Sequence, residues 1–144
     1  MRVLTALIAL PLLCACASDG AMPPPTADAP VPAIAGRHWV LVELNGQPVG
    51  ATQRQVYMEV NAEAGRVGGS GGCNTFGGSA ILQTGDRVRF SDVVSTKMAC
   101  MQGMEVEQAF FDVLSRADNY SLNGNSLSLN KARMAPLARF EAKD

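Results

Sequence analysis

The sequence is poor in the side chains that most enzymes use for chemistry. It has one histidine, His38, and four cysteines, of which only Cys73 and Cys100 follow residue 16. A nucleophilic cysteine needs a base such as histidine nearby, but His38 adjoins Trp39 in an expected strand. The thioredoxin-type Cys-x-x-Cys motif is absent. One histidine and two distant cysteines cannot easily supply four zinc ligands, so we expect no metal and no cofactor.

A strong excess of charge is also missing. Lys plus Arg number 12 and Asp plus Glu number 13, which gives a formal net charge of −1. The basic residues are scattered, and their densest spot is Arg87 with Arg89. Proteins that bind nucleic acid neutralise phosphates with clustered Lys and Arg, so we expect no nucleic acid among the partners. The 144 residues correspond to about one domain.

The apolar run at residues 3–13 is shorter than the roughly 20 residues of a membrane-spanning helix. It follows a basic start at Arg2 and has the length of the apolar region of a secretion signal. It ends in Leu13-Cys14-Ala15-Cys16, which resembles the bacterial lipobox. We expect residues 1–15 to be removed as a lipoprotein signal peptide and Cys16 to carry the lipid. Cys14 fits less well, because Leu13 would precede it where the peptidase pattern requires a small residue. The alternative is a buried helix of the fold.

The lipid on Cys16, palmitate included, is expected to attach the protein to the membrane, because two or more buried acyl chains make an anchor that rarely detaches. Ala17 and Ser18 follow, without the Asp that favours inner-membrane retention in enteric bacteria. We therefore expect an outer-membrane location facing the periplasm. Residues 16–35 hold five of the eight prolines. Such a segment favours extended conformations and is expected to be a disordered tether, which leaves residues 36–144 as the globular domain.

Short alternating segments separated by turn residues follow, which is typical of antiparallel strands. Turn signals lie at residues 45–48, 85–86 and 123–125. The expected strands are residues 38–44, 56–60, 66–70, 79–84, 87–90 with 92–95 as an extension, 119–122, 126–130 and 137–141.

One segment has a different period, and it predicts a helix. The apolar residues at 106, 109, 110, 113, 114 and 117 recur with the spacing of a single helical stripe. Glu105 and Glu107 lie in the first turn and Arg116 in the last, which suits the helix dipole. The stripe must be buried, and the face of the sheet is its available partner. The sequence therefore predicts an α+β domain, a highly twisted antiparallel sheet wrapped around one helix.

Cys73 and Cys100 allow two interpretations. Two thiols in an oxidising compartment favour a disulfide, and the alternative is a pair of buried free thiols acting as small apolar residues. Cys73 directly follows a glycine-rich segment, residues 68–72. This segment lacks the Lys-Ser/Thr end of a phosphate-binding loop. We interpret these glycines as features of a curved strand, and Asn74 as an amide that caps a turn.

Four features together resemble the META/HslJ-like domain family. They are the opening strand with Trp39, the Gly-Gly-Cys-Asn run followed by Phe-Gly-Gly, the Thr-x-Met-Ala-Cys run before a Phe-containing helix, and a closing hairpin with a final strand. The resemblance implies a small antiparallel half-barrel with a helix in its concave face. It also implies association with heat shock, antibiotic resistance, motility or virulence, without an established reaction. The family-motif residues carried over as structural elements are Gly71, Gly72, Cys73, Asn74, Thr96, Met98 and Cys100.

Three functional hypotheses follow. The first is a monomeric, non-catalytic envelope lipoprotein with a stress-response or assembly role, whose partner is an unidentified envelope protein or a small apolar ligand. The second is a lipid- or hydrophobe-binding module of the pilotin type, because a curved sheet over a helix can open an apolar pocket. The third is a thiol-disulfide redox protein that uses Cys73 and Cys100.

Overall fold

The computed structural model describes residues 33–143. The expected signal peptide, Cys16 and most of the expected tether lie outside the described residues. In chain order the elements are β1 (His38–Leu44), β2 (Gln47–Pro48), β3 (Tyr57–Asn61), β4 (Arg66–Ser70), β5 (Thr75–Gln83), β6 (Arg87–Ser95), α1 (Met104–Arg116), β7 (Asn119–Asn123), β8 (Ser126–Asn130) and β9 (Ala138–Lys143).

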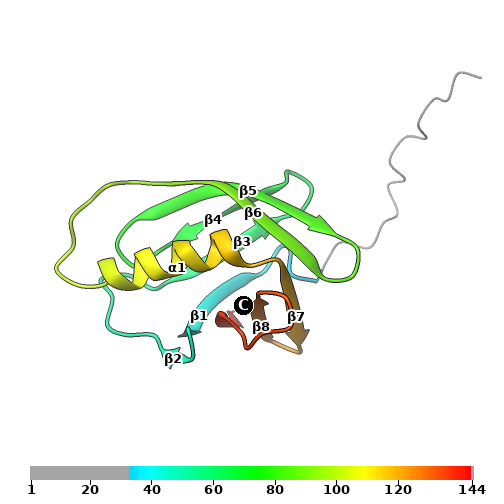
Figure 1. The fold of residues 1–144 in the computed structure, drawn as a ribbon. Helices are drawn as coiled ribbons and strands as arrows, with labels where there is room; N and C mark the ends of the chain where they lie inside the picture. The colour runs from blue at the N-terminus through cyan, green and yellow to red at the C-terminus, as the bar shows by residue number, and fades with distance from the viewer. Residues whose placement is uncertain (1–32, 144) are drawn as a thin grey trace, which may run out of the picture.

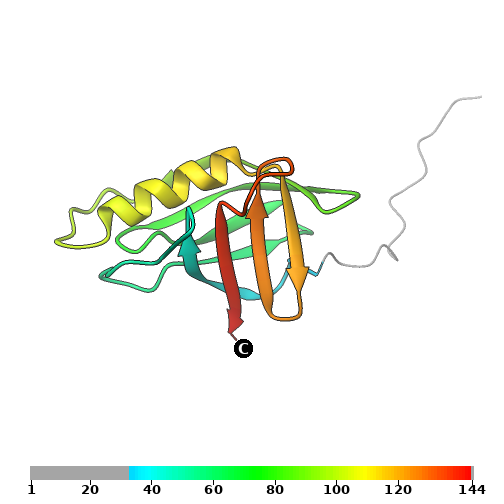
Figure 2. The same cartoon turned by 60° about the horizontal axis from the view of Figure 1, so that its bottom comes forward.

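The strands form one antiparallel sheet that curves until its two ends meet (Figure 1). The order is β2-β1-β3-β4-β5-β6-β7-β8-β9, and β1 also pairs with β9. β6 and β7 share only the pair Arg87 and Asn119, and the chain between them forms α1. Figure 2 shows α1 lying along one side of the curved sheet. The predicted α+β fold, a half-barrel-like antiparallel sheet around one helix, is confirmed.

Helix α1 buries the stripe that its sequence predicts. Phe110, Val113 and Leu114 are fully buried, and Ala117 just after the helix is buried with them. Phe110 packs edge-on against Phe76 of β5, with the ring centroids 5.6 Å apart, and lies 6.0 Å from Phe140 of β9. Full burial of one such side chain contributes about 1.5–3 kcal/mol, so this stripe holds the helix to both the central strand β5 and the terminal strand β9.

The packed domain begins before the predicted boundary at residue 36. Residues 33–36 form a turn, and Ile34 is 0% exposed in the core. The indole Nε1–H of Trp39 donates a hydrogen bond to the carbonyl of Ile34 at 2.8 Å. A buried indole needs such a partner. Ile34 therefore belongs to the core, although its neighbours in sequence have a tether-like composition.

Two local expectations need adjustment. The turn expected at residues 45–48 occupies only Asn45 and Gly46, after which Gln47–Pro48 pairs back onto β1 as β2. Strand β5 begins at Thr75 and not near residue 79, despite the glycines at 77 and 78. Glycine weakens a strand, but pairing with β4 on one side and β6 on the other holds this stretch extended.

Candidate functional site

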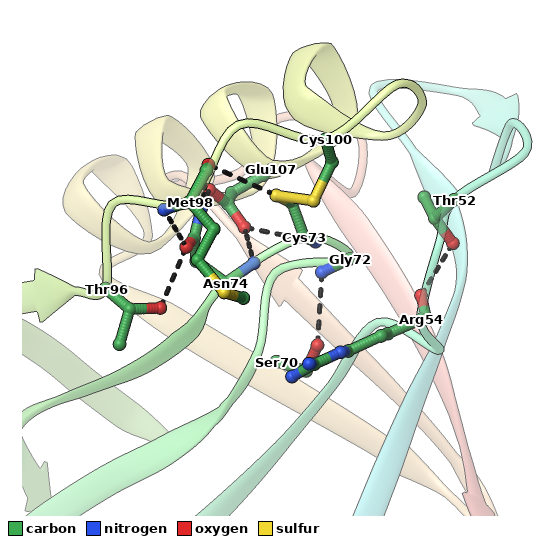
Figure 3. Close-up of a disulfide and its surroundings, with 10 residues drawn as sticks. All are labelled: Thr52, Arg54, Ser70, Gly72, Cys73, Asn74, Thr96, Met98, Cys100 and Glu107. Atoms are coloured by element: carbon green, nitrogen blue, oxygen red, sulfur yellow. Dashed lines mark hydrogen bonds between the residues drawn. A yellow bond between two sulfur atoms is a disulfide. The ribbon is translucent and has the colours of Figure 1, made fainter.

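Two loops meet at the start of α1 and bring the family-motif residues together (Figure 3). Residues 71–74 connect β4 to β5, and residues 96–103 connect β6 to α1. Polar contacts and a disulfide join these loops to each other and to the helix. We call this cluster the clamp; it comprises Gly71, Gly72, Cys73, Asn74, Thr96, Met98, Cys100 and Glu107.

Glu107 is the residue of α1 that holds the first loop. Its side chain is in the interior, with the residue 7% exposed. Oε2 accepts hydrogen bonds from the backbone N–H of Asn74 at 2.6 Å and of Cys73 at 3.3 Å, and Oε1 accepts from Asn74 Nδ2 at 2.8 Å. Hydrogen bonds to a charged group contribute about 1.5–3 kcal/mol each. The carboxylate therefore fixes the loop's backbone and side chain at once.

Asn74 uses every hydrogen-bonding position of its amide. Oδ1 accepts from the hydroxyl of Thr96 at 2.8 Å and from the backbone N–H of Met98 at 2.8 Å. Nδ2 donates to Glu107 Oε1 at 2.8 Å and to the carbonyl of Met98 at 3.3 Å. An amide has two lone pairs and two N–H donors, so the buried Asn74 is saturated. It ties the loop after β6 to Glu107.

The structure joins Cys73 and Cys100 in a disulfide with an S–S distance of 2.03 Å. This is the pairing that the sequence favours over two free thiols. Cys73 is fully buried, and Cys100 is half-buried on the outer loop. The Sγ atom of Cys73 lies 3.4 Å from the carbonyl of Met98; because a bonded sulfur carries no proton, this is a van der Waals contact. The disulfide and the Asn74 amide thus fasten the same two loops side by side (Figure 3).

Gly71 and Gly72 are glycines for two different steric reasons. A Cβ atom on Gly71 would lie 2.6 Å from Glu107 Cγ, so a side chain there would displace the carboxylate. Gly72 has φ +109, and a Cβ atom there would lie 3.0 Å from Thr52 Cγ2. A positive φ of this size favours glycine. Both positions let the loop pass close to its neighbours, which agrees with their structural interpretation.

The sequence motifs predict a structural role for every clamp residue except Glu107. The position of Glu107 in the first turn predicts an interaction with the helix dipole, but its oxygens bind the loop before β5. The signal was its place in the helical pattern, since residues 107, 110 and 114 follow the i, i+3, i+7 spacing of one face. A carboxylate on a buried face requires polar partners, and the loop supplies them.

Met98 contributes to the clamp through its backbone and not through its side chain. Its N–H and carbonyl both bond to Asn74, while the residue as a whole is 45% exposed. Met101, three residues on, is 100% exposed, and Met104 at the start of α1 is also exposed. We call these three exposed residues, Met98, Met101 and Met104, the methionine fringe.

Two further findings concern the described part of the chain. Within residues 33–143, no group of three or more His, Cys, Asp or Glu side chains is arranged to hold a metal ion. In the same range, no helix combines the length and apolar character needed to cross a membrane.

Two titratable groups outside the clamp have shifted pKa values. The backbone N–H of Ala132 donates to the carboxylate of Asp118 at 2.8 Å and is the main reason why the pKa of Asp118 lies below its ordinary value. The Asn119 amide and the Lys131 ammonium act in the same direction. Burial raises the pKa of Tyr120, and the charge of Asp86 raises it further.

Comparisons with known proteins agree with this architecture. The family model described as "META domain" matches residues 32–144. A solution structure of a protein from Burkholderia xenovorans is 22% identical, with a TM-score of 0.61, over 85% of this chain and 97% of that one. A second solution structure is also 22% identical, with a TM-score of 0.57, over 73% of this chain and 87% of the other.

A crystal structure of a DUF4847 family protein from Bacteroides vulgatus ATCC 8482 is more distant. It is 17% identical, with a TM-score of 0.50, and the match covers 76% of this chain and 93% of that one. No curated protein matches the sequence. At these identities the solved structures show a common fold.

Proposed function

The chain belongs to the META domain family, and on that premise we propose that it is a non-catalytic lipoprotein of the bacterial cell envelope that acts by binding. The observation that carries the proposal is the clamp. The polar side chains of the motif are bonded to one another, with Asn74 saturated and both oxygens of Glu107 occupied. Groups used in this way build the fold, and a catalytic acid, base or nucleophile needs an atom turned toward a substrate.

The envelope location is supported from two parts of the chain. Residues 1–16 have the basic start, the apolar run and the cysteine of a lipoprotein signal. The disulfide between Cys73 and Cys100 agrees with an exported protein, because disulfides persist in oxidising compartments such as the periplasm. We propose that Cys16 anchors a monomeric domain at the outer membrane, facing the periplasm, where it serves in envelope stress or assembly.

The anchor is tested by replacing each of the two N-terminal cysteines. Expressed in a bacterial host with labelled palmitate, the wild-type chain and the Cys14→Ser variant should both incorporate label and sediment with outer membranes. The Cys16→Ser variant should incorporate none and be released from the membrane, because the acyl chains supply the affinity. Label retained on Cys16→Ser, or a wild-type chain that stays in the cytoplasm, would contradict the proposal.

The binding role is tested on intact cells. Crosslinking should recover a reproducible envelope partner with the wild-type chain, and a strain lacking the protein should lose stress tolerance. Repeated crosslinking without any partner, together with normal stress tolerance in the deletion strain, would count against this role.

A second candidate, a module for a small apolar ligand, is favoured by one observation. A pocket of about 230 Å³ lies between the β1–β2 turn and α1 and is lined in part by Leu44, Val49, Val106 and Ala109. The concave face of the sheet itself is occupied by Phe110, Val113 and Leu114. Native mass spectrometry of the purified protein tests this candidate, since a co-purified hydrophobic ligand supports it and a ligand-free protein that binds no fatty acid opposes it.

The remaining alternative, a thiol-disulfide redox protein, has less support. Exchange needs an accessible sulfur for attack by a thiolate, and here Cys73 is buried and only Cys100 is partly accessible. We therefore propose that this disulfide serves stability.

A further inference from the structure

The outer face of the sheet carries a groove of about 930 Å³ over β3 and β4. It is separate from the clamp and from the pocket beside α1. The lining includes the start of β1, the turn between β3 and β4, Gly77 from β5 and Lys143 from β9. Its volume falls within the range of about 300–1,000 Å³ that is usual for small-molecule sites.

The floor of the groove is bare backbone. Strand register places His38 of β1 opposite Glu59 of β3, Glu59 opposite Gly68 of β4, and Gly68 opposite Gly77 of β5. One row across the sheet therefore begins with the polar side chains of His38 and Glu59. It continues over β4 and β5 with two glycines, which have no side chain. Adjacent strands lie about 4.8 Å apart, so the glycines leave a flat strip wide enough for a ring.

Packing does not require both glycines of this row. A Cβ atom on Gly68 would lie 3.3 Å from the carbonyl oxygen of Phe76, which is tight. A Cβ atom on Gly77 would meet nothing closer than 3.9 Å, the carbonyl oxygen of Val67. The neighbouring Gly78 lies at a register shift between β5 and β6. A side chain is excluded there, because a Cβ atom would lie 2.9 Å from the carbonyl oxygen of Ser91. What glycine at position 77 provides is an open floor, and glycine within a strand often marks close approach of a ligand.

An aromatic wall stands beside this floor. The rings of His38 and Tyr57 are stacked, with centroids 4.2 Å apart and an interplanar angle of 27°. His38 Nδ1 lies 2.6 Å from Glu59 Oε1, which fixes the imidazole and the carboxylate together. On the other side of Tyr57, its partner in β4 is the small residue Ser70, and the diagonal neighbours are glycines. No bulky cross-strand side chain of β4 covers Tyr57 on that side.

The polar groups around the groove carry both signs of charge. Arg37, Arg66 and Lys143 are cationic, while Glu59 and Glu63 are anionic. A polyanion would meet the carboxylates and a polycation would meet the basic groups. A neutral ligand with hydroxyls can accept from the basic side chains and donate to the acidic ones. A flat C–H face on the same ligand would suit the backbone floor and the aromatic wall.

We propose that this groove binds a neutral oligosaccharide, with a sugar ring on the floor formed by Gly68 and Gly77 and its hydroxyls bonded by Glu59 and Arg66. Pyranose rings combine hydroxyls around the edge with an apolar face of C–H groups. An extended peptide fits less well, because the N–H and carbonyl groups of β3, β4 and β5 are already paired within the sheet and leave no edge for strand addition. This inference goes beyond the proposed function and does not depend on the lipid anchor.

The test uses the full chain carrying Cys16→Ser, labelled with ¹⁵N and titrated with neutral chito-, cello- and malto-oligosaccharides at millimolar concentration. At least one of them should shift the amide signals of Gly68, Gly77 and Tyr57, with an affinity that hardly changes with salt because no net charge is neutralised. Gly77→Leu fills the floor and should weaken this binding about tenfold or more. It should unfold no earlier than the unsubstituted protein, because leucine replaces a strand glycine at a position with room.

Thr75→Leu is the matched control. Thr75 lies on the same strand, is exposed, and does not line the groove, so this variant should bind like the unsubstituted protein. Unchanged binding by a folded Gly77→Leu variant would overturn the proposal. The same holds if none of the three neutral probes shifts these amides, or if only a charged probe, an oligolysine peptide or a hyaluronan fragment, does so.

Discussion

The contact between Glu107 and Asn74 is an interior interaction that the sequence does not reveal. Glutamate is common in the first turn of a helix, and asparagine is common in turns. Neither residue type therefore stands out at its position. The two residues are 33 positions apart along the chain, so no local pattern shows that they contact each other. The motif residues around them could be selected from the sequence, and their interpretation as structural elements agrees with their contacts. The sequence does not predict that the Glu107 carboxylate binds the loop before β5.

An Asn74→Asp substitution tests this interior network by changing one polar group. The new carboxylate would face Glu107 Oε1 and the carbonyl of Met98 where Nδ2 now donates to both. We expect a loss of about 3 kcal/mol or more in the free energy of unfolding at neutral pH, because two acceptors and two charges are brought together. Urea unfolding measures this loss.

The same variant should recover stability as the pH falls. Two neighbouring carboxylates raise the pKa of one of them in the folded state, so the folded protein binds more protons than the unfolded chain and gains stability in acid. Asn125→Asp is the matched control, since Asn125 is exposed and its Oδ1 already accepts from Arg37 at 2.7 Å. Equal stability of the two variants at neutral pH would contradict the arrangement described for Asn74.

Asp118 provides a second pH test, in which stability should fall in acid because the pKa of this carboxylate is lowered in the folded state. Its pKa lies below the ordinary value of 3.8, chiefly because the backbone N–H of Ala132 donates to the carboxylate. The folded state therefore holds this proton less tightly than the unfolded chain, and the contribution is present above pH 3.8 and lost as the pH falls through the lower folded value. Asp118→Asn should be less stable than wild type at neutral pH and equal to it in strong acid. Urea unfolding at both pH values, with Asp112→Asn for comparison, checks this; a difference that persists in acid would refute it.

At the scale of elements, the parts that could be predicted are those that local forces determine. The stripe from Val106 to Ala117 gives the helix its buried face, and the turns at Asn45 and Gly85 begin hairpins within a residue or two of the expected place. The start of β5, the pairing of β1 with β9 and the burial of Ile34 depend on contacts between distant segments. Local propensity does not predict these features. The glycines at 77 and 78 disfavour a strand in β5, and the proline-rich segment before Ile34 favours a tether.

The disulfide is the element-scale contact that can be removed cleanly. It closes a loop with a sequence separation of 27, for which the chain-entropy model gives about 3.5 kcal/mol. The double variant Cys73→Ser with Cys100→Ser should lose stability by this amount in urea unfolding and keep its binding activity when folded. Comparison with Cys16→Ser, which leaves the disulfide intact, controls for the loss of a cysteine. Full stability with loss of activity would instead indicate redox chemistry.

At the scale of the whole molecule, the clamp and the proposed lipid anchor would have different roles. The clamp binds the loops before β5 and before α1 into one unit and leaves the outer sheet face and the methionine fringe free for contacts. The proposed lipid on Cys16 would bring these surfaces to the envelope. In this account the motif residues matter to function because they keep the domain folded.

The most direct test compares function with the amount of folded protein for three clamp variants, Asn74→Ala, Thr96→Val and Glu107→Gln. Each is expressed in a strain that lacks the protein, and stress tolerance and folded, membrane-attached protein are measured at the normal and at a reduced growth temperature. We predict that stress tolerance follows the folded amount for all three variants, and that it returns at the lower temperature as folding recovers. A variant that is folded and anchored at the wild-type level but fails to restore tolerance at either temperature would contradict the structural role of the clamp.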